Sequence, residues 1–237
     1  RGFDQLIDVF GADHGGYVKR MKAAVSALSD GKVPLDIKLT QLVKLIKNGE
    51  EFKMSKRAGT FVMLSDVVAQ AGADVTRFHM LTRKNDAPLD FDFAKVLEQS
   101  KDNPVFYVQY ANARVNSVLG KARAAGIAVD DATLAAADLT KLSHEAELAV
   151  AKKLAEWPRL VEIAARSNEP HRIAFFLYDL AGAFHSYYNL GNDRSEKRFI
   201  VAQETELSAA RLFLAVQIGQ VIRNGLALLG VEAVEEM

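Results

Sequence analysis

The chain of 237 residues contains no cysteine, so disulfides and sites in which cysteine binds zinc or an iron–sulfur cluster are excluded. No apolar run approaches about 18 residues, and the sequence therefore predicts no membrane-spanning helix. Both absences fit a protein of the reducing cytoplasm, which is the location we expect.

An excess of charge of one sign is also absent, because 30 Lys and Arg residues are balanced by 30 Asp and Glu residues. The total charge therefore does not indicate a nucleic-acid partner, although a local basic patch is enough to contact phosphates. The sequence has no Walker-type phosphate loop, no Ser/His/Asp arrangement and no metal-ligand spacing of its histidines. We expect no resident metal ion.

The composition is that of an ordinary globular protein, with 49% hydrophobic and 25% charged residues. The length is sufficient for one large or two ordinary domains. The sequence begins at Arg1-Gly2-Phe3 and enters a predicted strand almost at once. We therefore interpret it as a piece of a longer protein.

The first third of the chain mixes strand and helix patterns. A short apolar strand at residues 6–10 is followed by a glycine-containing turn at 11–16 and a helix from Tyr17 to about Gly31. This order is typical of parallel α/β sheets. Asn48-Gly49 predicts a hairpin turn between two further strands, the second beginning at about Phe52.

The rest of the chain has helical patterns, and we place the boundary near residue 95, between an α/β piece (1–95) and an all-α bundle (96–237). Polar connections are expected at 126–139 and 189–198. We expect four long helices. The first begins at Asn103-Pro104, and the second follows Ser143 until Pro158 ends or kinks it. The third begins near Pro170, and the fourth runs from Leu207 to Leu229 and is closed by Gly230.

The most informative motif is Lys53-Met54-Ser55-Lys56, in a predicted loop after the hairpin. Two ammonium groups three residues apart can converge on a polyphosphate and follow its charge as it develops. A bare pair of lysines at this spacing is more often a solvated basic loop. The longer string from Lys53 to Gly59 is much rarer and favours the phosphate site.

A second candidate site is Gly11-Ala12-Asp13-His14, just past the carboxyl end of the first strand, where parallel sheets usually bind nucleotides. Gly11 would let a ligand approach the backbone, and Asp13 can accept hydrogen bonds from ribose hydroxyls. Judged alone, Asp13 is more often the cap of an ordinary turn, and His14 is more often a structural histidine.

Aromatic and polar residues gather near two predicted helix ends, at Tyr107–Arg114 and Phe184–Asn189. Such rings can stack on unpaired bases, while core packing is favoured for Phe184 and equally weighted for the tyrosines. Tyr187 and Tyr188 diverge by about 100° on a helix, so they cannot both face one core. We expect Tyr187 to be the exposed, base-stacking ring, and Tyr188 to continue the other side of the helix.

Taken together, these strings resemble the class I arginyl-tRNA synthetases, in one order along essentially the whole chain. The matching strings are Phe10 to His14 with Tyr17, Lys53 to Thr60, Gly72-Ala73-Asp74 with Arg77-Phe78, Leu89 to Asp92, Gln99-Ser100 with Asp102-Asn103-Pro104, Tyr107 to Ala111 with Ala113-Arg114, Phe184 to Ser186 with Tyr188-Asn189, and Leu228 to Met237. The His-x-Gly-His motif of that family is not in this chain, and we expect it upstream.

The resemblance implies a mostly α chain, with the C-terminal remnant of a class I Rossmann-like catalytic domain followed by a helical anticodon-binding domain. It implies activation of L-arginine by ATP with Mg²⁺ and transfer to tRNA(Arg), by a protein that is usually monomeric. The residue patterns and the resemblance together give these candidate site residues: Lys53 and Lys56 (catalysis), Gly11, Asp13, His14, Met54 and Ser55 (ATP), and Tyr110, Arg114, Tyr187, Tyr188, Asn189 and Met237 (tRNA).

Two alternatives remain open from the residues themselves. One is a non-catalytic RNA-binding module that kept a synthetase scaffold, against which the intact Lys53 and Lys56 argue. The other is a cysteinyl or methionyl relative with a similar helical domain, against which the Tyr107–Arg114 and C-terminal strings argue. Specificity for arginine comes only from the family likeness.

Overall fold

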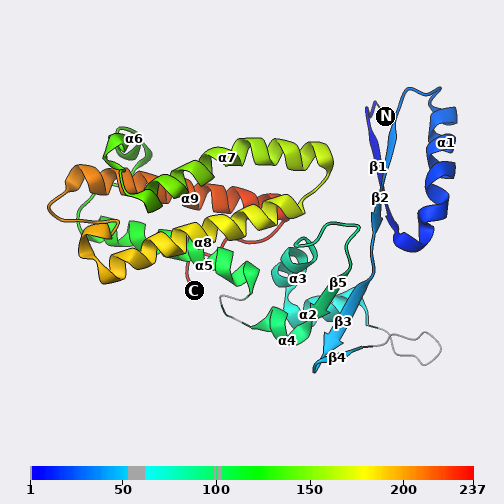
Figure 1. Cartoon of the computed structure of the whole chain (residues 1–237), viewed down its shortest axis with the longest axis horizontal. Coiled ribbons are helices and arrows are strands. Elements are labelled where there is room, and N and C mark those ends of the chain that lie inside the picture. Colours follow the sequence, from blue (N-terminus) through cyan, green and yellow to red (C-terminus); the bar gives the residue numbers. More distant parts are fainter. Residues whose placement is uncertain (1, 53–61, 99, 101–102) are drawn as a thin grey trace. The chain divides into compact units, whose positions relative to one another are not determined.

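The computed structural model describes residues 2–52, 62–98, 100 and 103–237 (Figure 1). The chain divides into two compact units. The first comprises Arg1–Asp66 and Arg83–Val96, and the second comprises Val67–Thr82 and Leu97–Met237. The chain passes from the first unit to the second after Val96, next to the boundary drawn near residue 95, but the segment Val67–Thr82 also belongs to the second unit. We describe each unit by itself.

In the first unit, β1 (Leu6–Gly11) leads through the short 3-10 helix η1 (Ala12–Tyr17) into α1 (Val18–Leu28) and then β2 (Leu35–Thr40). The two strands pair in parallel over their whole length, from Leu6 opposite Leu35 to Gly11 opposite Thr40. The predicted strand–turn–helix order is therefore confirmed. The sequence patterns had not indicated β2.

A second sheet in this unit contains β3 (Val43–Lys47), β4 (Glu50–Glu51) and β5 (Leu89–Asp92), with α4 (Phe93–Leu97) following directly. β3 and β4 form the predicted hairpin, but β4 ends at Glu51, before Phe52, where the second strand was expected to begin. β3 also pairs in parallel with β5. Asn48 and Gly49 both have positive φ angles, 55° and 80°. A two-residue turn of this kind needs left-handed backbone at both positions, which explains the Asn-Gly pair.

The second unit is a helical bundle. Its elements are α3 (Ala73–Met80) and most of α2 (Leu64–Ala71), then α5 (Pro104–Ala124), α6 (Asp131–Ala135), η2 (Leu139–Lys141), α7 (Glu145–Ser167), α8 (His171–Asp193), η3 (Ser195–Lys197) and α9 (Thr205–Leu229). The long helices α5, α7, α8 and α9 lie side by side in Figure 1, and each packs on at least two of the others. Their apolar faces form the core.

The ends of α5 and α9 agree with the sequence. Asn103 is the N-cap of α5, with Pro104 in the first helical position, and Gly230 ends α9 with φ of 66°. Two details were wrong: His144 rather than Ser143 caps α7, and α8 continues to Asp193 instead of giving way to a loop at Asn189. Pro158, which was expected to end or kink the helix, lies inside α7, which continues to Ser167. Packing against neighbouring helices can outweigh the roughly 3 kcal/mol cost of an internal proline.

Among the described helices, α9 alone is long and apolar enough to cross a membrane, with a mean hydropathy of 1.5 in its most apolar window. Its composition has another explanation, because 56% of that window is buried inside the protein. Arg211 on this helix also forms a buried ion pair with Glu147 of α7, at 2.7 Å. α9 is therefore the central core helix of the bundle.

Candidate nucleic-acid interface

The main candidate site is a cavity of about 470 Å³ on the bundle, where the first half of α5 meets the second half of α8. Both helices contribute aromatic or cationic side chains, and the end of the chain supplies a further wall. The lining residues are Ser100, Phe106, Tyr107, Tyr110, Arg114, His185, Asn189 and Met237.

The guanidinium of Arg114 lies between two aromatic rings. Its Cζ atom is 4.4 Å from the ring centre of Tyr110 and 4.7 Å from that of Tyr188. Tyr110 precedes Arg114 by one helical turn on α5, whereas Tyr188 comes from α8. Stacking against both rings holds the planar cation in one orientation at the cavity.

His185 contacts the guanidinium of Arg114 through one of its ring nitrogens. Its ring is 4% exposed, with Nδ1 lying 2.9 Å from Nη1 of Arg114 and Nε2 lying 3.1 Å from the carbonyl oxygen of Tyr107. A guanidinium only donates and a carbonyl only accepts, so the ring must be neutral, with its proton on Nε2. Burial, and to a smaller extent the positive charge of Arg114, lower the pKa of His185 below its ordinary value.

This arrangement predicts a loss of stability in acid. Because the folded pKa of His185 is depressed, its contribution is complete above the ordinary pKa of 6.5 and is lost as pH falls through the folded value. We expect the free energy of unfolding of the wild type to fall more between about pH 8 and pH 5 than that of His185→Gln. Denaturant unfolding at both pH values measures this, and parallel pH dependences would contradict it.

Tyr107 completes the floor of the cavity. Its ring centre is 4.5 Å from that of His185 and 5.1 Å from that of Tyr178 on α8. Burial raises the pKa of the Tyr107 hydroxyl above its ordinary value. Tyr107 therefore serves as a neutral aromatic surface in this site.

The C-terminal segment reaches the cavity because polar side chains of the bundle hold it. The side-chain amides of Gln109 and Asn112 on α5 donate to the carbonyl oxygens of Glu232 (2.9 Å) and Val234 (2.8 Å). The backbone N–H of Glu232 in turn donates to Asp74 at 3.1 Å. Met237, which is 61% exposed, thereby lies at the cavity. Gln109 and Asn112 are polar residues on the apolar face of α5, and this is the sequence pattern that could have indicated these contacts.

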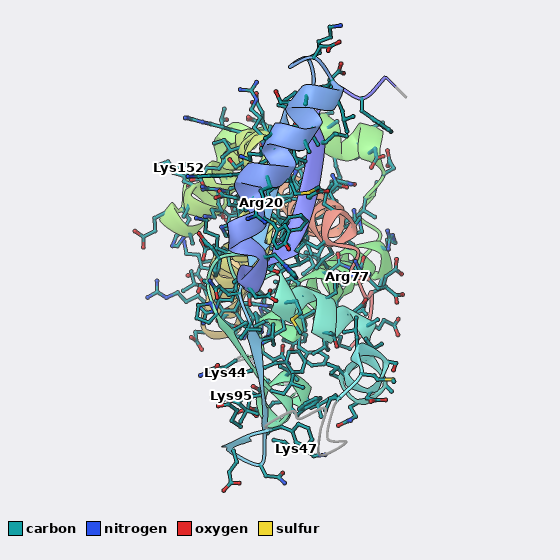
Figure 2. All side chains as sticks on the ribbon, turned by 90° about the vertical axis from the view of Figure 1, so that its right-hand side faces the viewer. Arg20, Lys44, Lys47, Arg77, Lys95 and Lys152 are labelled. Atoms are coloured by element: carbon teal, nitrogen blue, oxygen red, sulfur yellow. The ribbon has the colours of Figure 1, made fainter. Side chains whose placement is uncertain are left out.

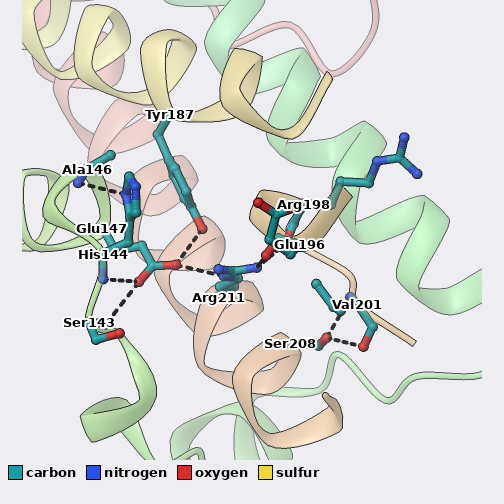
Figure 3. Close-up of polar contacts among 10 residues, drawn as sticks. All are labelled: Ser143, His144, Ala146, Glu147, Tyr187, Glu196, Arg198, Val201, Ser208 and Arg211. Carbon is teal, nitrogen blue, oxygen red and sulfur yellow. Dashed lines mark hydrogen bonds and ion pairs between the residues drawn. The ribbon is translucent and has the colours of Figure 1, made fainter. Parts of the chain in front are cut away.

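The structure brings together five of the six residues assigned to tRNA: Tyr110, Arg114, Tyr188, Asn189 and Met237. The expectation for Tyr187 was wrong. Its side chain is fully buried, and its hydroxyl donates to Glu147 at 3.0 Å (Figure 3). Tyr188, which we had placed on the other side of the helix, is the ring that reaches Arg114.

The buried partner of Tyr187 belongs to a polar network in the core (Figure 3). Arg211 donates to Glu147 and to the carbonyl oxygens of Glu196 and Arg198, at 2.7, 2.8 and 2.6 Å respectively. The second carboxylate oxygen of Glu147 accepts from the backbone N–H groups of Ser143 and His144. The network joins the start of α7 to α8, α9 and η3.

The first unit carries the residues assigned to ATP. A cavity of about 550 Å³ is lined by Val9, Phe10, Gly11, His14, Tyr17 and Met21. A Cβ atom on Gly11 would lie 2.6 Å from the Asp13 carboxylate, so a larger residue could not occupy this position without displacing Asp13. Asp13 and His14 are both exposed and lie 3.6 Å apart.

Lys53, Met54, Ser55 and Lys56 lie outside the described residues. The hairpin that precedes them is described, and Figure 2 shows Lys44 and Lys47 on β3 and Lys95 on α4 of the same unit. The roles of the four residues stay a prediction.

Comparisons with known proteins assign the helical unit to a family. Residues 108–237 match the family described as DALR anticodon binding domain, and the chain belongs to this family. Within that range lie Tyr110, Arg114, His185, Asn189 and Met237 of the cavity. The second unit is thus a helical anticodon-binding domain.

Over all 237 residues the chain is 73% identical to the arginine–tRNA ligase of Ruegeria pomeroyi and 70% identical to that of Paracoccus denitrificans, spanning 41% of each relative. The putative arginyl-tRNA synthetase structure from Campylobacter jejuni matches with a TM-score of 0.85 at 32% identity, covering 100% of this chain and 49% of that one. The Thermus thermophilus arginyl-tRNA synthetase shares the fold, with a TM-score of 0.70 at 23% identity over 99% of this chain and 41% of that one. The predicted family resemblance and fold class are confirmed.

Proposed function

We propose that this chain is the C-terminal part of a cytoplasmic, monomeric arginine–tRNA ligase and that its helical unit binds the anticodon loop of tRNA(Arg). The observation that carries the proposal is the position of the Arg114 guanidinium, which is stacked between Tyr110 and Tyr188 at a cavity. All three residues lie in the part of the chain that matches the anticodon-binding family. Rings and a planar cation are the groups that stack on unpaired bases.

The cavity offers hydrogen bonds as well as stacking. A guanidinium has five N–H donors, and within the described part of the chain Arg114 uses one of its nitrogens, towards His185. The remaining donors can bind a base edge or a phosphate. Asn189 is exposed at the rim and adds an amide that both donates and accepts.

For the first unit we propose the ATP site of the same ligase. The carboxylate of L-arginine attacks the α-phosphate of ATP, giving arginyl-adenylate and pyrophosphate. A hydroxyl of the terminal ribose of tRNA(Arg) then attacks the arginyl carbonyl, giving arginyl-tRNA and releasing AMP. Gly11, Asp13 and His14 would hold the adenosine part, and Lys53 to Lys56 the phosphates, with Mg²⁺ entering with ATP. This assignment rests on the family and on the strand–turn position of Gly11.

Replacement of Arg114 tests the anticodon site. In the complete ligase, Arg114→Ala should weaken binding to a tRNA(Arg) anticodon stem-loop by about 5- to 150-fold, because loss of one stacked base costs roughly 1–3 kcal/mol. Fluorescence anisotropy measures the dissociation constant. The matched control is Arg159→Ala, which removes an exposed arginine from α7 and should leave affinity unchanged.

A minihelix that lacks the anticodon separates binding from folding. Its affinity should be the same for the wild type and Arg114→Ala. An equal loss on both RNAs would mean that the bundle is damaged, and unchanged binding to the stem-loop would exclude Arg114 from the site.

A further inference from the structure

A second cavity lies farther along α5, where that helix faces the end of α8 and the segment that follows it. Its volume is about 330 Å³. Apolar, aromatic, amide and cationic side chains all contribute to it. The lining residues are Val118, Lys121, Tyr188, Gly191, Asn192, Arg198, Phe199 and Ile200.

The wall formed by residues 194–201 is fixed by buried side chains of α9. Arg211 holds the carbonyl oxygens of Glu196 and Arg198, and the Ser208 hydroxyl both accepts from the N–H of Val201 (2.9 Å) and donates to its carbonyl (3.1 Å). Figure 3 shows both anchors. A segment bound in this way forms a wall of defined shape, because it is held from inside the core.

Gly191 lets this wall approach α8. A Cβ atom there would lie 3.1 Å from Cα of Arg198, and Nε of Arg198 donates to the Gly191 carbonyl at 3.1 Å. The close approach brings the Arg198 side chain to the cavity mouth, which Lys121 of α5 also lines. The cavity therefore has two cations from separate elements.

Neither cation is neutralised within the described part of the chain, since no ion pair there involves Lys121 or Arg198. Both side chains are exposed. The interior differs in character, with Val118 and Phe199 buried and the Tyr188 ring as one wall. A cationic rim over an aromatic and apolar floor is complementary to a nucleotide, which has a charged phosphate and a flat base.

We propose that this cavity is a second nucleotide-binding site, in which one base lies against Tyr188 and its phosphate is bound by Lys121 and Arg198. The proposal rests on the anticodon-loop function above and extends it to a separate subsite. Tyr188 lies between the two sites, since Arg114 covers its ring on one side and the ring also lines the second cavity.

An open groove of about 900 Å³ joins the two cavities. It shares Tyr110, Arg114 and Met237 with the first and Tyr188 and Asn192 with the second. Arg114 and Lys121 are seven residues apart on α5, which corresponds to about 10 Å along a helix axis. An RNA strand that follows α5 from one cavity to the other would pass Arg123, and also the carboxylates of Glu235 and Glu236, which line the same groove.

The test is binding of the complete ligase to an anticodon stem-loop over a range of salt concentrations. The variant Lys121→Ala/Arg198→Gln should bind at least about 10-fold more weakly. Its affinity should also depend less on salt: the magnitude of the slope of log affinity against log salt should decrease by roughly 0.7 for each phosphate that the protein no longer neutralises. The matched control is Lys152→Ala/Arg159→Gln, which removes two exposed cations from α7 (Lys152 in Figure 2) and should change neither quantity. Lys121→Ala alone leaves the Arg198–Gly191 hydrogen bond intact and should give a smaller slope change, because Arg198 still contacts the same phosphate.

The base itself is tested with stem-loops that carry one abasic nucleotide at each loop position. At one position the missing base should cost the wild type about 5- to 150-fold in affinity. This penalty should shrink in the Lys121/Arg198 variant and persist in Tyr110→Ala, which alters only the first cavity and the groove.

The outcomes separate this proposal from the one on which it rests. If the wild type binds the stem-loop no better than the minihelix, the anticodon function itself fails. If Arg114→Ala weakens binding while the Lys121/Arg198 variant changes neither affinity nor salt slope, the second site is wrong and the first stands. A change in salt slope without a coupled abasic position would also overturn it, since the cavity would then hold no base.

Discussion

Glu147→Gln is expected to lower the free energy of unfolding by about 3–5 kcal/mol, the usual cost of removing one partner from a buried ion pair. Glu147 is 1% exposed and Arg211 is 2% exposed, so water cannot replace the missing charge. Urea or guanidinium unfolding of the variant and the wild type, analysed for midpoint and slope, gives the difference.

Glutamine is the informative substitution because it keeps the size of the side chain. One glutamate oxygen accepts from Tyr187 and Arg211, and the amide oxygen of glutamine can still do so. The other oxygen accepts from two backbone N–H groups, and an amide nitrogen there would meet donors with a donor. The variant therefore loses the charge and leaves buried groups unsatisfied.

Glu145→Gln is the matched control, because Glu145 lies in the same first turn of α7 but is exposed. It should cost at most about 1 kcal/mol, through the helix dipole. If Glu147→Gln is no more destabilising than this control, the network does not stabilise the bundle.

The pH dependence of the same variant gives an independent check. Burial alone would raise the pKa of Glu147, but the hydrogen bonds from His144, Arg211 and Tyr187 outweigh it and hold the pKa below the ordinary value of 4.5. Stability from this group is therefore present above that value and is lost as pH falls through the folded pKa. The gap between wild type and Glu147→Gln should narrow in strong acid.

Tyr187 shows where prediction from sequence stopped. The helical spacing established that Tyr187 and Tyr188 face different ways, and the structure confirms this. Which ring faces inward was decided by Glu147, forty residues earlier, and by Arg211, on another helix. The buried carboxylate of Glu147 accepts the hydrogen bond of the tyrosine hydroxyl, and Arg211 balances the charge of that carboxylate. Local neighbours such as Ser186 and Asn189 could not reveal that partner.

Local signals were sufficient where the determinant itself was local. The start of α5 at Asn103-Pro104 and the turn at Asn48-Gly49 depend on backbone geometry that those residues favour. β2 and β5 were missed because their pairing depends on strands distant in the sequence. The grouping of Arg114 with Tyr188 likewise needed the packing of α5 on α8, and before the structure only the family likeness suggested it.

In the complete ligase, Lys56→Ala should lower the rate of arginine activation by on the order of 10²-fold or more. In the proposed mechanism negative charge grows on the departing pyrophosphate, and an ammonium directed at that charge stabilises the transition state more than bound ATP. The Michaelis constant for ATP should therefore change less than the rate. Lys53→Ala should act in the same direction.

Arginine-dependent pyrophosphate exchange in the presence of tRNA(Arg) measures this step, and stem-loop binding measured in parallel shows whether the helical unit is intact. Lys152→Ala, which removes an exposed lysine from α7, is the control for the loss of one positive charge (Figure 2). Wild-type rates in both Lys53→Ala and Lys56→Ala would exclude the phosphate role. Loss of stem-loop affinity along with the rate would place the defect in folding instead. A slow exchange reaction with intact anticodon binding is the result that the proposed division between the two units requires, because Lys53 and Lys56 precede Val67, where the second unit begins.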